Sequence, residues 1–319
     1  MSRSQEMAHI ARQADGSYSA NWGVHVLKSA FQPIFAFSEG KLRAAAYEGL
    51  IRPFREGKPA SPGAFFSSIP AGEQGAVESV ARSLHLLNAA ACIDRSAFIF
   101  VNFDPRHFDG ALSIHKALTT MREALGEARD VLAPERIVCE ITEQKTLTES
   151  SLLDFVKALR NAGYRVAVDD YGAEDSDMRR IQALRPDVVK FDSAWVTRLM
   201  GSAPGIALLN EMVRQFTDMG TLTIFEGIEQ GWQLDIAEKA GVSMVQGFVL
   251  AKPELAPTSF GVFSAVEPFG NSAPERSAPE TAAPATPMQS NEPDIPVAPN
   301  RRMEARPLRP TRVFGKRTG

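Results

Sequence analysis

The chain has few residues of the kinds that mark secreted, zinc-binding or membrane proteins. Its 319 residues include only two cysteines, Cys92 and Cys139, and neither lies in a Cys-x-x-Cys or Cys/His cluster. This excludes a disulfide framework and a structural zinc site, and a reducing compartment is expected. No apolar run approaches the roughly 18 to 20 residues that span a bilayer, and the N-terminus lacks the apolar stretch of a secretory signal. We therefore expect a cytoplasmic protein with no transmembrane segment.

Proline and charge are unevenly distributed along the chain. Residues 265–319 hold ten of the 21 prolines and carry a net charge of +2. Because the whole chain has a net charge of −3, the remaining residues carry −5. The stretch 272–300 is rich in Ala, Pro, Ser and Glu, with too little apolar surface to offset the entropy of folding. We expect residues 265–319 to be a disordered, Pro-rich linker with a basic C-terminus. Its basic end suits a protein or anionic partner, although a solvated tail that only aids solubility is the more common explanation.

The body of the chain, residues 24–264, alternates between strand and helix patterns after a short leader at 1–23. Apolar segments that predict strands lie at 30–37, 42–50, 97–102, 137–141, 165–169, 188–191, 222–226 and 244–248. Helical patterns lie between most of them, and Gly163, Gly220 and Gly241 stand where three helices should stop. Alternation of this kind is typical of a parallel α/β protein. Eight strands in this length match a TIM-type (β/α)8 barrel.

Polar residues with ligand or proton-handling chemistry stand at the ends of these strands. They are Glu48, Asn102, Glu140, Asp169, Asp170, Lys190, Glu226 and Gln246. The C-terminal ends of barrel strands converge on one face, so these side chains should become neighbours. Each has a plain local alternative: Glu48 can pair with Arg52, Asn102 can start an Asx turn, and Asp170 can cap a helix. Together, five carboxylates on one face are costly without cations.

The ligand types favour hard cations. Carboxylate and amide oxygens suit Mg²⁺ or Mn²⁺ better than zinc, and none of the five histidines lies at a strand end. We expect the histidines to be surface or packing residues. Two such cations that share a carboxylate are suited to in-line displacement at phosphorus. Lys190 and Arg52 add positive charge for a phosphodiester or an attacking water.

Eight short motifs occur in a characteristic order between about residues 28 and 254. They are FQPIF at 31–35, YEGLIR at 47–52, VNFDP at 101–105, CEITE at 139–143, VDDYG at 168–172, KFD at 190–192, EGIE at 226–229, and QGF followed by KP at 246–253. In this order they resemble the EAL domain, the bacterial cyclic di-GMP phosphodiesterase module. The resemblance implies a modified (β/α)8 barrel, often dimeric, that uses two Mg²⁺ or Mn²⁺ ions to hydrolyse cyclic di-GMP to the linear dinucleotide in second-messenger signalling.

The resemblance also implies a role for each motif residue. Glu48, Asn102, Glu140 and Asp169 would bind one metal, and Asp169 would bridge to a second metal that Asp170 also holds. Glu226 and Gln246 would complete the metal and water shell, and Lys190 would orient or deprotonate the water. Glu229 would brace the loop that carries the second-metal ligands. Gln32, Glu48, Leu50 and Arg52 would contact the substrate.

Two departures from the family pattern bear on activity. Gly49 replaces the alanine of the name-giving motif, and only a small effect of the lost methyl group is expected. The loop at 173–178 reads Ala-Glu-Asp-Ser-Asp-Met, with three extra acids and one glycine fewer than usual, which should weaken turnover. One alternative is therefore a catalytically weak or inactive EAL module that acts as a cyclic di-GMP receptor or protein-interaction module. The other is a barrel metalloenzyme with a different substrate.

Overall fold

The computed structural model describes residues 9–108, 110–142, 148–173 and 177–262. The chain divides into two compact units, Met1–Ser272 and Ala273–Gly319, and all described residues belong to the first. The predicted disordered, basic tail at 265–319 lies outside the described residues, as do Glu174 and Asp175 of the altered loop. Across the described part, no helix has the length and apolarity needed to cross a membrane.

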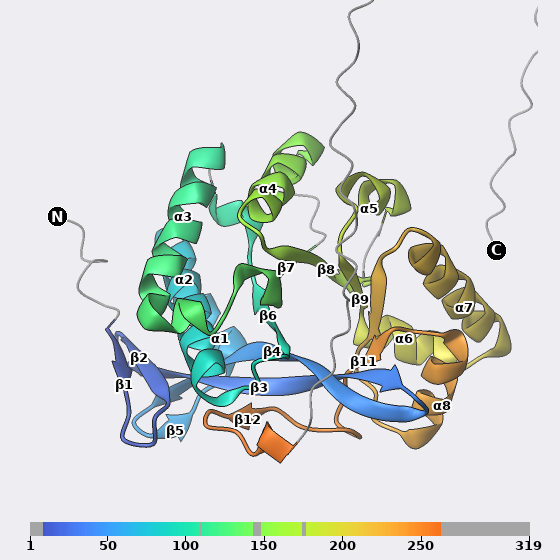
Figure 1. The fold of residues 1–319 in the computed structure, drawn as a ribbon, viewed down its shortest axis with the longest axis horizontal. Coiled ribbons are helices and arrows are strands. Elements are labelled where there is room, and N and C mark those ends of the chain that lie inside the picture. Colours follow the sequence, from blue (N-terminus) through green and yellow to red (C-terminus); the bar gives the residue numbers. More distant parts are fainter. Residues whose placement is uncertain (1–8, 109, 143–147, 174–176, 263–319) are drawn as a thin grey trace, which may run out of the picture. The chain divides into compact units, whose positions relative to one another are not determined.

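Eight strands close into a barrel, which confirms the predicted fold class (Figure 1). In spatial order around the barrel they run β3, β11, β10, β9, β8, β7, β6 and β4, and a β3–β4 pairing closes the ring. Their bounds are β3 (His25–Ser38), β4 (Lys41–Arg55), β6 (Phe98–Asn102), β7 (Ile137–Thr142), β8 (Arg165–Tyr171), β9 (Val188–Phe191), β10 (Leu222–Phe225) and β11 (Met244–Val245). Each overlaps one of the eight predicted strands.

The first strand of the barrel departs from the expected parallel arrangement. β3 is antiparallel to both of its barrel neighbours, β4 and β11, whereas the other barrel pairs are parallel. Only Glu39 and Gly40 connect β3 to β4, and both have positive φ (51° and 71°). A two-residue turn of this kind makes a hairpin and cannot cross over to a parallel strand. The reversal pairs Gln32 of β3 with Glu48 of β4.

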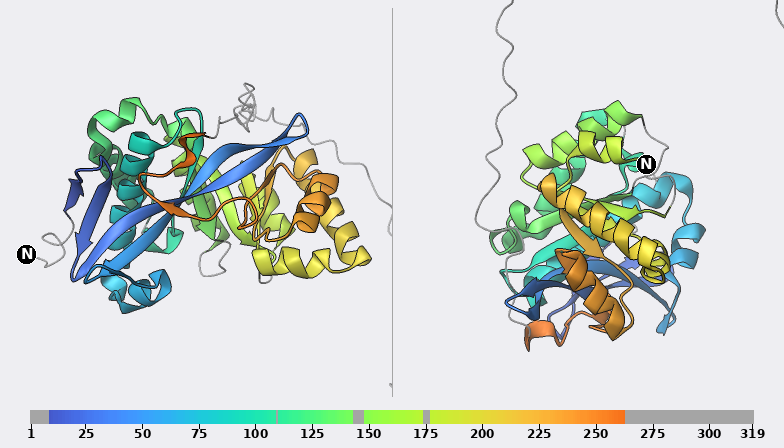
Figure 2. Two further views of the ribbon diagram at one scale, coloured as in Figure 1. Left: turned by 90° about the horizontal axis from the view of Figure 1, so that it is seen from below. Right: turned by 90° about the vertical axis from the view of Figure 1, so that its right-hand side faces the viewer.

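Helices follow most of the barrel strands and lie along the outside of the barrel (Figure 2). Their bounds are α1 (Pro62–Ser68), α2 (Ala71–Cys92), α3 (Gly110–Leu125), α4 (Glu149–Asn161), α5 (Met178–Leu184), α6 (Ser193–Met200), α7 (Ala203–Asp218) and α8 (Gly231–Ala240). Gly163, Gly220 and Gly241, the predicted stops, all have positive φ just after α4, α7 and α8. Glycine is the residue best able to end a helix in this way.

Short strands extend the sheet beyond the barrel. They are β1 (Ile10–Arg12) and β2 (Tyr18–Trp22), which continue from the N-terminal half of β3, β5 (Lys58–Pro59) beside β4, and β12 (Glu254–Leu255) beside β3. The described part of the leader at 1–23 thus pairs with the barrel sheet. Asn88 of α2 ties it down, because its Oδ1 accepts from the Tyr18 N–H at 2.7 Å and its Nδ2 donates to the Tyr18 carbonyl at 2.9 Å.

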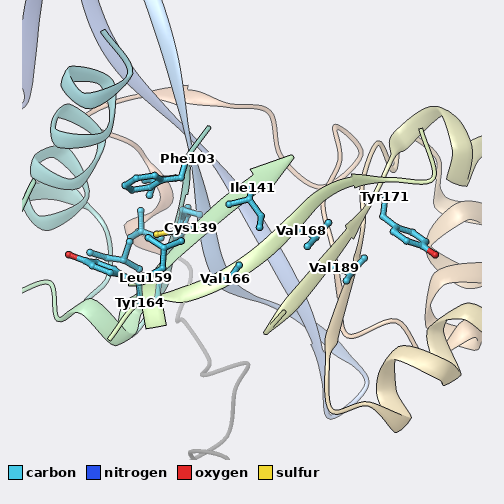
Figure 3. Close-up of a cluster of buried hydrophobic side chains, with 14 of the residues drawn as sticks. Phe103, Cys139, Ile141, Leu159, Tyr164, Val166, Val168, Tyr171 and Val189 are labelled. Carbon is cyan, nitrogen blue, oxygen red and sulfur yellow. The ribbon is translucent and has the colours of Figure 1, made fainter. Parts of the chain in front are cut away.

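The side chains of each barrel strand alternate between two hydrophobic layers. Outward-facing residues such as Ile141, Val166, Val168 and Val189 pack with helix residues such as Leu159 in the main core (Figure 3). Inward-facing residues form a second cluster that fills the barrel interior: Ile34, Ala46, Phe100, Val138, Ala167, Val188, Ile224 and Met244 are among its members. The interior is therefore packed with apolar groups and leaves no room for a site except at its ends.

Candidate active site

One polar residue stands two positions from each of eight interior apolar residues. Because strand side chains repeat with a period of two, each polar residue faces the same interior one layer higher. The pairs are Ala46 and Glu48, Phe100 and Asn102, Val138 and Glu140, Ala167 and Asp169, Val188 and Lys190, Ile224 and Glu226, Met244 and Gln246, and, on the reversed strand, Ile34 and Gln32. The alternation thus places a polar layer directly on the apolar barrel filling.

Lys190 lies at the centre of this layer. Only 1% of its side chain is exposed, and its Nζ lies 2.5 Å from Oε1 of Glu140, 2.7 Å from Oε1 of Glu226 and 3.1 Å from Oδ1 of Asp169. Oε2 of Glu48 is 3.7 Å away and also accepts a 2.7 Å hydrogen bond from Nε2 of Gln246. Carboxylates from the ends of four strands therefore converge on one ammonium group.

The charges in this layer do not balance. Burial alone would lower the pKa of Lys190, but the attraction of the surrounding carboxylates outweighs it and raises that pKa well above its usual value. Burial raises the pKa of Glu226 to about 8 despite the attraction of Lys190, and burial likewise raises the pKa of Glu140. Without further cations, Glu226 and Glu140 therefore hold protons more readily than ordinary carboxyl groups do. Positive charge bound at this site would displace those protons.

A break in the sheet turns the two adjacent aspartates toward the site. The pairing of β8 with β9 shifts register between Val168 and Tyr171, so Asp169 and Asp170 stand in a bulge. Asp170 has a φ of 57°, and burial together with the charge of Asp169 raises its pKa. Oxygen atoms of Asp169, Asp170 and Glu226 lie within 4.8 Å of one another. An all-carboxylate group of this size suits a hard divalent cation.

Buried carboxylate oxygens support the same interpretation. Oε2 of Glu140 is buried and has no hydrogen-bond partner among the described residues, while Oε1 of Glu140 and Oδ1 of Asp169 are buried against the Lys190 ammonium. The ion pairs with Lys190 offset part of their charge, but buried oxygen atoms without donors are costly. Bound cations would satisfy them, so the residues present fit a metal centre.

Two cavities adjoin the polar layer. The first, of about 530 Å³, is lined by Leu50, Arg52, Asn102 and Glu140 on the strand side. The second, of about 350 Å³, is lined by Gln32, Glu48, Asp169, Asp170, Lys190, Glu226 and Gln246, with Glu229 among its other lining residues. All the predicted site residues thus line one cavity or the other. Glu229 is exposed, and Asn102 lies on the side of the first cavity.

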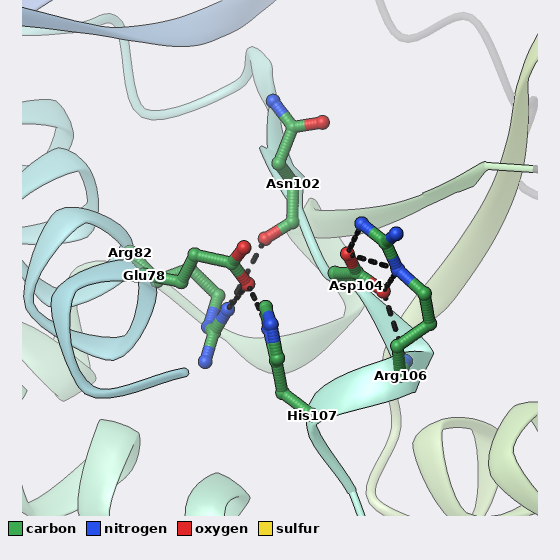
Figure 4. A network of polar contacts seen from close by, with 6 residues as sticks. All are labelled: Glu78, Arg82, Asn102, Asp104, Arg106 and His107. Atoms are coloured by element: carbon green, nitrogen blue, oxygen red, sulfur yellow. Dashed lines mark hydrogen bonds and ion pairs between the residues drawn. The ribbon is translucent and has the colours of Figure 1, made fainter. Parts of the chain in front are cut away.

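The far wall of the first cavity was not predicted from the sequence. It includes Glu78 and Arg82 of α2 and Asp104 and Arg106 after β6 (Figure 4). Arg82 is 4% exposed, its Nη1 lies 3.6 Å from Oε2 of Glu78, and its guanidinium lies 4.0 Å from the ring centroid of Phe103. Burial lowers the pKa of Arg82 to about 10. The spacing of residues within α2 does not predict this wall, because Glu78 and Arg82 face residues that follow β6 in the sequence.

Glu78 and Asp104 also lie close to His107, and one donor atom from each falls within 4.8 Å of the others. Each acid already has a basic partner, however. Arg82 and His107 contact Glu78, and Nε of Arg106 donates to Oδ2 of Asp104 at 2.8 Å. The group therefore works as a charge-balanced wall rather than as a second metal centre.

Gly49 has a role that the sequence did not reveal. A Cβ atom placed on Gly49 would lie 2.9 Å from Cγ and 3.0 Å from Cβ of His85. His85 is 4% exposed, and its Nδ1 lies 2.8 Å from Oγ of Ser29. Burial lowers the pKa of His85 to about 3, so the ring is neutral. The missing methyl group therefore makes room for a buried histidine.

We expect Gly49→Ala to lower the free energy of unfolding by about 1–3 kcal/mol, because the added methyl overpacks the His85 ring. In a His85→Ala background the same change should be neutral or stabilising, since alanine suits a strand better than glycine. Gly72→Ala is the matched control, because nothing lies within 4 Å of a Cβ at that position. Chemical denaturation of the four variants measures the coupling. Equal effects of Gly49→Ala in both backgrounds would show that the two residues do not interact.

Comparison with known proteins identifies relatives over most of the barrel. The chain matches the family model described as the EAL domain over residues 25–253. The probable cyclic di-GMP phosphodiesterase PdeG of Escherichia coli (strain K12) is 26% identical over 234 residues, which cover 70% of this chain and 44% of PdeG. An uncharacterized EAL-domain containing protein, YkuI of Bacillus subtilis, is 28% identical over 230 residues, which cover 70% of this chain and 54% of YkuI. The chain thus spans about half the length of these curated relatives.

Solved structures agree with this assignment. BlrP1 of Klebsiella pneumoniae, in a complex with calcium and cyclic di-GMP, aligns with a TM-score of 0.61 and 25% identity, covering 72% of this chain and 56% of that one. YkuI of Bacillus subtilis, in complex with substrate cyclic di-GMP and calcium, aligns with a TM-score of 0.61 and 26% identity, covering 72% and 55%. The ordered motifs, the barrel and the match over residues 25–253 together show that this chain belongs to the EAL domain family.

Proposed function

We propose that the chain is a metal-dependent phosphodiesterase that hydrolyses cyclic di-GMP to the linear dinucleotide. The observation that carries the proposal is the charge of the polar layer. Five carboxylates, those of Glu48, Glu140, Asp169, Asp170 and Glu226, surround or adjoin a single ammonium group. When all are ionised, four negative charges remain, and two divalent cations would neutralise them. Mg²⁺ and Mn²⁺ are the cations that these oxygen ligands favour.

The position of each residue in the polar layer suggests its role in binding the cations or the water. Glu48, Asn102, Glu140 and Asp169 would hold one cation, and Asp169 and Asp170 would hold the other, with Glu226 and Gln246 completing the shell. Such ions lower the pKa of water and offset charge on phosphoryl oxygens. Lys190, fixed among carboxylates, is placed to hold a water by hydrogen bonding or to exchange a proton with it. Gln246 holds Glu48 in place through its 2.7 Å hydrogen bond.

Substrate size and charge agree with the two cavities. Glu140 lines the first cavity and lies 2.5 Å from Lys190, which lines the second, so a phosphodiester at the metals could extend a nucleoside into each. Arg52, Arg82 and Arg106 place three guanidinium groups around the first cavity, suited to phosphate and to base acceptor atoms. BlrP1 and YkuI were solved with cyclic di-GMP bound, which supports this ligand for a member of the same family.

A second candidate is an EAL module that binds cyclic di-GMP with little or no turnover. The altered loop at 173–178 favours it, because extra acids near Asp170 would repel a dianionic substrate. One of those acids has a structural task, however. Oδ1 of Asp177 accepts from the Arg179 N–H at 2.9 Å and caps α5. Asp177 is therefore accounted for, which leaves Glu174 and Asp175 as the acids that bear on this alternative.

The test is a timed incubation of the full chain with cyclic di-GMP in Mg²⁺, in Mn²⁺ and in chelator, with products separated by chromatography. Linear dinucleotide that forms only with a divalent cation supports the phosphodiesterase. Binding measured in parallel without turnover supports the receptor. Neither binding nor turnover would overturn both and favour a protein-interaction role.

Arg52 provides a test of substrate placement. It is half-buried beside Glu48, burial lowers its pKa, and its guanidinium lines the first cavity. We expect Arg52→Ala to raise KM for cyclic di-GMP about 10- to 100-fold, the equivalent of one charged hydrogen bond to phosphate, with a smaller change in kcat. Arg55→Ala, at the exposed end of the same strand, is the control. A KM unchanged by Arg52→Ala would remove Arg52 from the binding site.

A further inference from the structure

The first turn of α6 contacts both loops that carry ligands of the second cation. Asp192, which precedes α6, donates its N–H to the Tyr171 carbonyl at 3.0 Å and accepts from the Trp195 N–H at 2.8 Å. The end of β8 and the start of α6 are thus tied through the backbone. Tyr171 directly follows the bulged Asp169 and Asp170, so its position limits where those carboxylates can point.

Trp195 packs against the backbone of this bulge. A Cβ atom placed on Gly172 would lie 2.5 Å from Cδ2 and 2.8 Å from Cγ of Trp195, so the indole lies directly on the glycine. The same ring stacks on Phe191 at a centroid distance of 5.8 Å and meets the Tyr171 ring edge-on at 6.4 Å. Phe191 is the neighbour of Lys190. One side chain therefore contacts both the Lys190 strand and the Asp170 bulge.

The loop after β10 rests on the same turn of α6. A Cβ atom on Gly227 would lie 1.7 Å from Oγ of Ser193, which leaves no space for any side chain at position 227. Gly227 follows Glu226 and has a φ of 64°. The loops that carry Asp170 and Glu226 are thus set by Trp195 and Ser193, two residues apart in α6.

Asp170 needs such support because its backbone is strained. A φ of 57° in a residue other than glycine costs about 1 kcal/mol or more and persists only where neighbouring contacts enforce it. If the indole were removed, Gly172 could move into the vacated space, and Asp170 could relax away from Glu226. The oxygens of Asp169, Asp170 and Glu226, which lie within 4.8 Å of one another, would then move apart and no longer share one ion.

We propose that Trp195 is a positioning residue that holds the Asp170 bulge in the geometry needed to bind the second cation. The inference rests on the proposed two-metal function. Of the four residues proposed to hold the first cation, Glu48, Asn102 and Glu140 stand on β4, β6 and β7, and only the shared Asp169 lies in the bulge, so the first cation should be affected less than the second.

The experiment is a Mn²⁺ titration of the full-length protein without nucleotide, with free Mn²⁺ followed by electron paramagnetic resonance. We expect Trp195→Leu to keep the affinity of one ion and to weaken the other about 10- to 100-fold, as is usual when support behind a ligand is lost. Trp195→Phe keeps an aromatic ring against Gly172 and should stay close to the unaltered protein. Trp232→Leu, an exposed tryptophan on α8, is the matched control.

The outcomes separate this inference from the proposed function. Two ions bound by Trp195→Leu with unaltered affinity would overturn the positioning role, and so would an equal loss at both sites, because that would indicate a general disturbance. Circular dichroism checks that the variant is folded, and Trp195→Met, which also removes the ring but fills more of its space, carries the test if it is not. Absence of bound Mn²⁺ in the unaltered protein would instead count against the two-metal function itself.

Discussion

Glu48→Ala is expected to reduce metal-dependent hydrolysis of cyclic di-GMP about a thousandfold while leaving the barrel intact. Glu48 lies 3.7 Å from Lys190 and is hydrogen bonded to Gln246, and its strand neighbour in the interior layer is Ala46. Removal of its carboxylate would deprive the proposed first cation of a ligand, and a loss of about 4 kcal/mol of transition-state stabilisation corresponds to that factor.

The same substitution should not destabilise the protein in chelator. It removes one of several carboxylates that repel each other in a buried layer, so the thermal midpoint should stay level or rise. In Mg²⁺ the unaltered protein should instead have the higher thermal midpoint, because it gains more stability from the bound ions. Glu238→Ala, an exposed acid of α8, serves as the control. Turnover at the unaltered rate in Glu48→Ala would show that the metal centre has been assigned to the wrong residues.

Lys190→Met should have a large effect on both stability and activity. The ammonium lies within 3.1 Å of Glu140, Glu226 and Asp169 and is 1% exposed, so its removal leaves buried carboxylates without their partner. Breaking a buried ion pair on one side costs about 3–5 kcal/mol. In chelator we therefore expect a loss of that size in the free energy of unfolding, measured by denaturant titration.

Divalent cations should restore part of that stability to Lys190→Met, because they bring positive charge to the same carboxylates. Hydrolysis should nevertheless stay about 10²–10⁴-fold below that of the unaltered protein, since the group proposed to hold the water is missing. Lys157→Met, an exposed lysine of α4, should change neither property. A chelator-treated Lys190→Met as stable as the unaltered protein would contradict this prediction, because it would show that the ammonium contributes no net stability to the layer.

The sequence alone predicts much of the barrel and its polar face. Strong apolar runs such as Val166–Val168 and Leu222–Phe225 became β8 and β10, because apolar content and strand propensity act locally. The direction of β3 was not predicted, since it depends on a two-residue turn at Glu39 and Gly40 rather than on the apolar pattern. The apolar pattern of the strands and the turn that reverses β3 together bring Gln32 onto the same face as Glu48.

Contacts between segments that are distant in the sequence could not be predicted from the sequence pattern. The fit of His85 against Gly49 joins α2 to β4, and the fit of Trp195 against Gly172 joins α6 to the end of β8. Neither histidine nor tryptophan carries a local signal of what it touches. The same is true of Glu78 and Arg82, which meet the residues after β6 only because α2 packs beside that strand.

The amino-acid sequence by itself therefore determined the strand count, the chemistry of the strand ends and the family, because alternation with a period of two and short ordered motifs are local properties. Only the tertiary structure decided that four carboxylates share one buried lysine, that a glycine in the name-giving motif accommodates a histidine, and that α6 supports the Asp170 bulge. The physical reason is that charge balance and close packing depend on distances in space, which barrel closure sets and spacing along the chain does not.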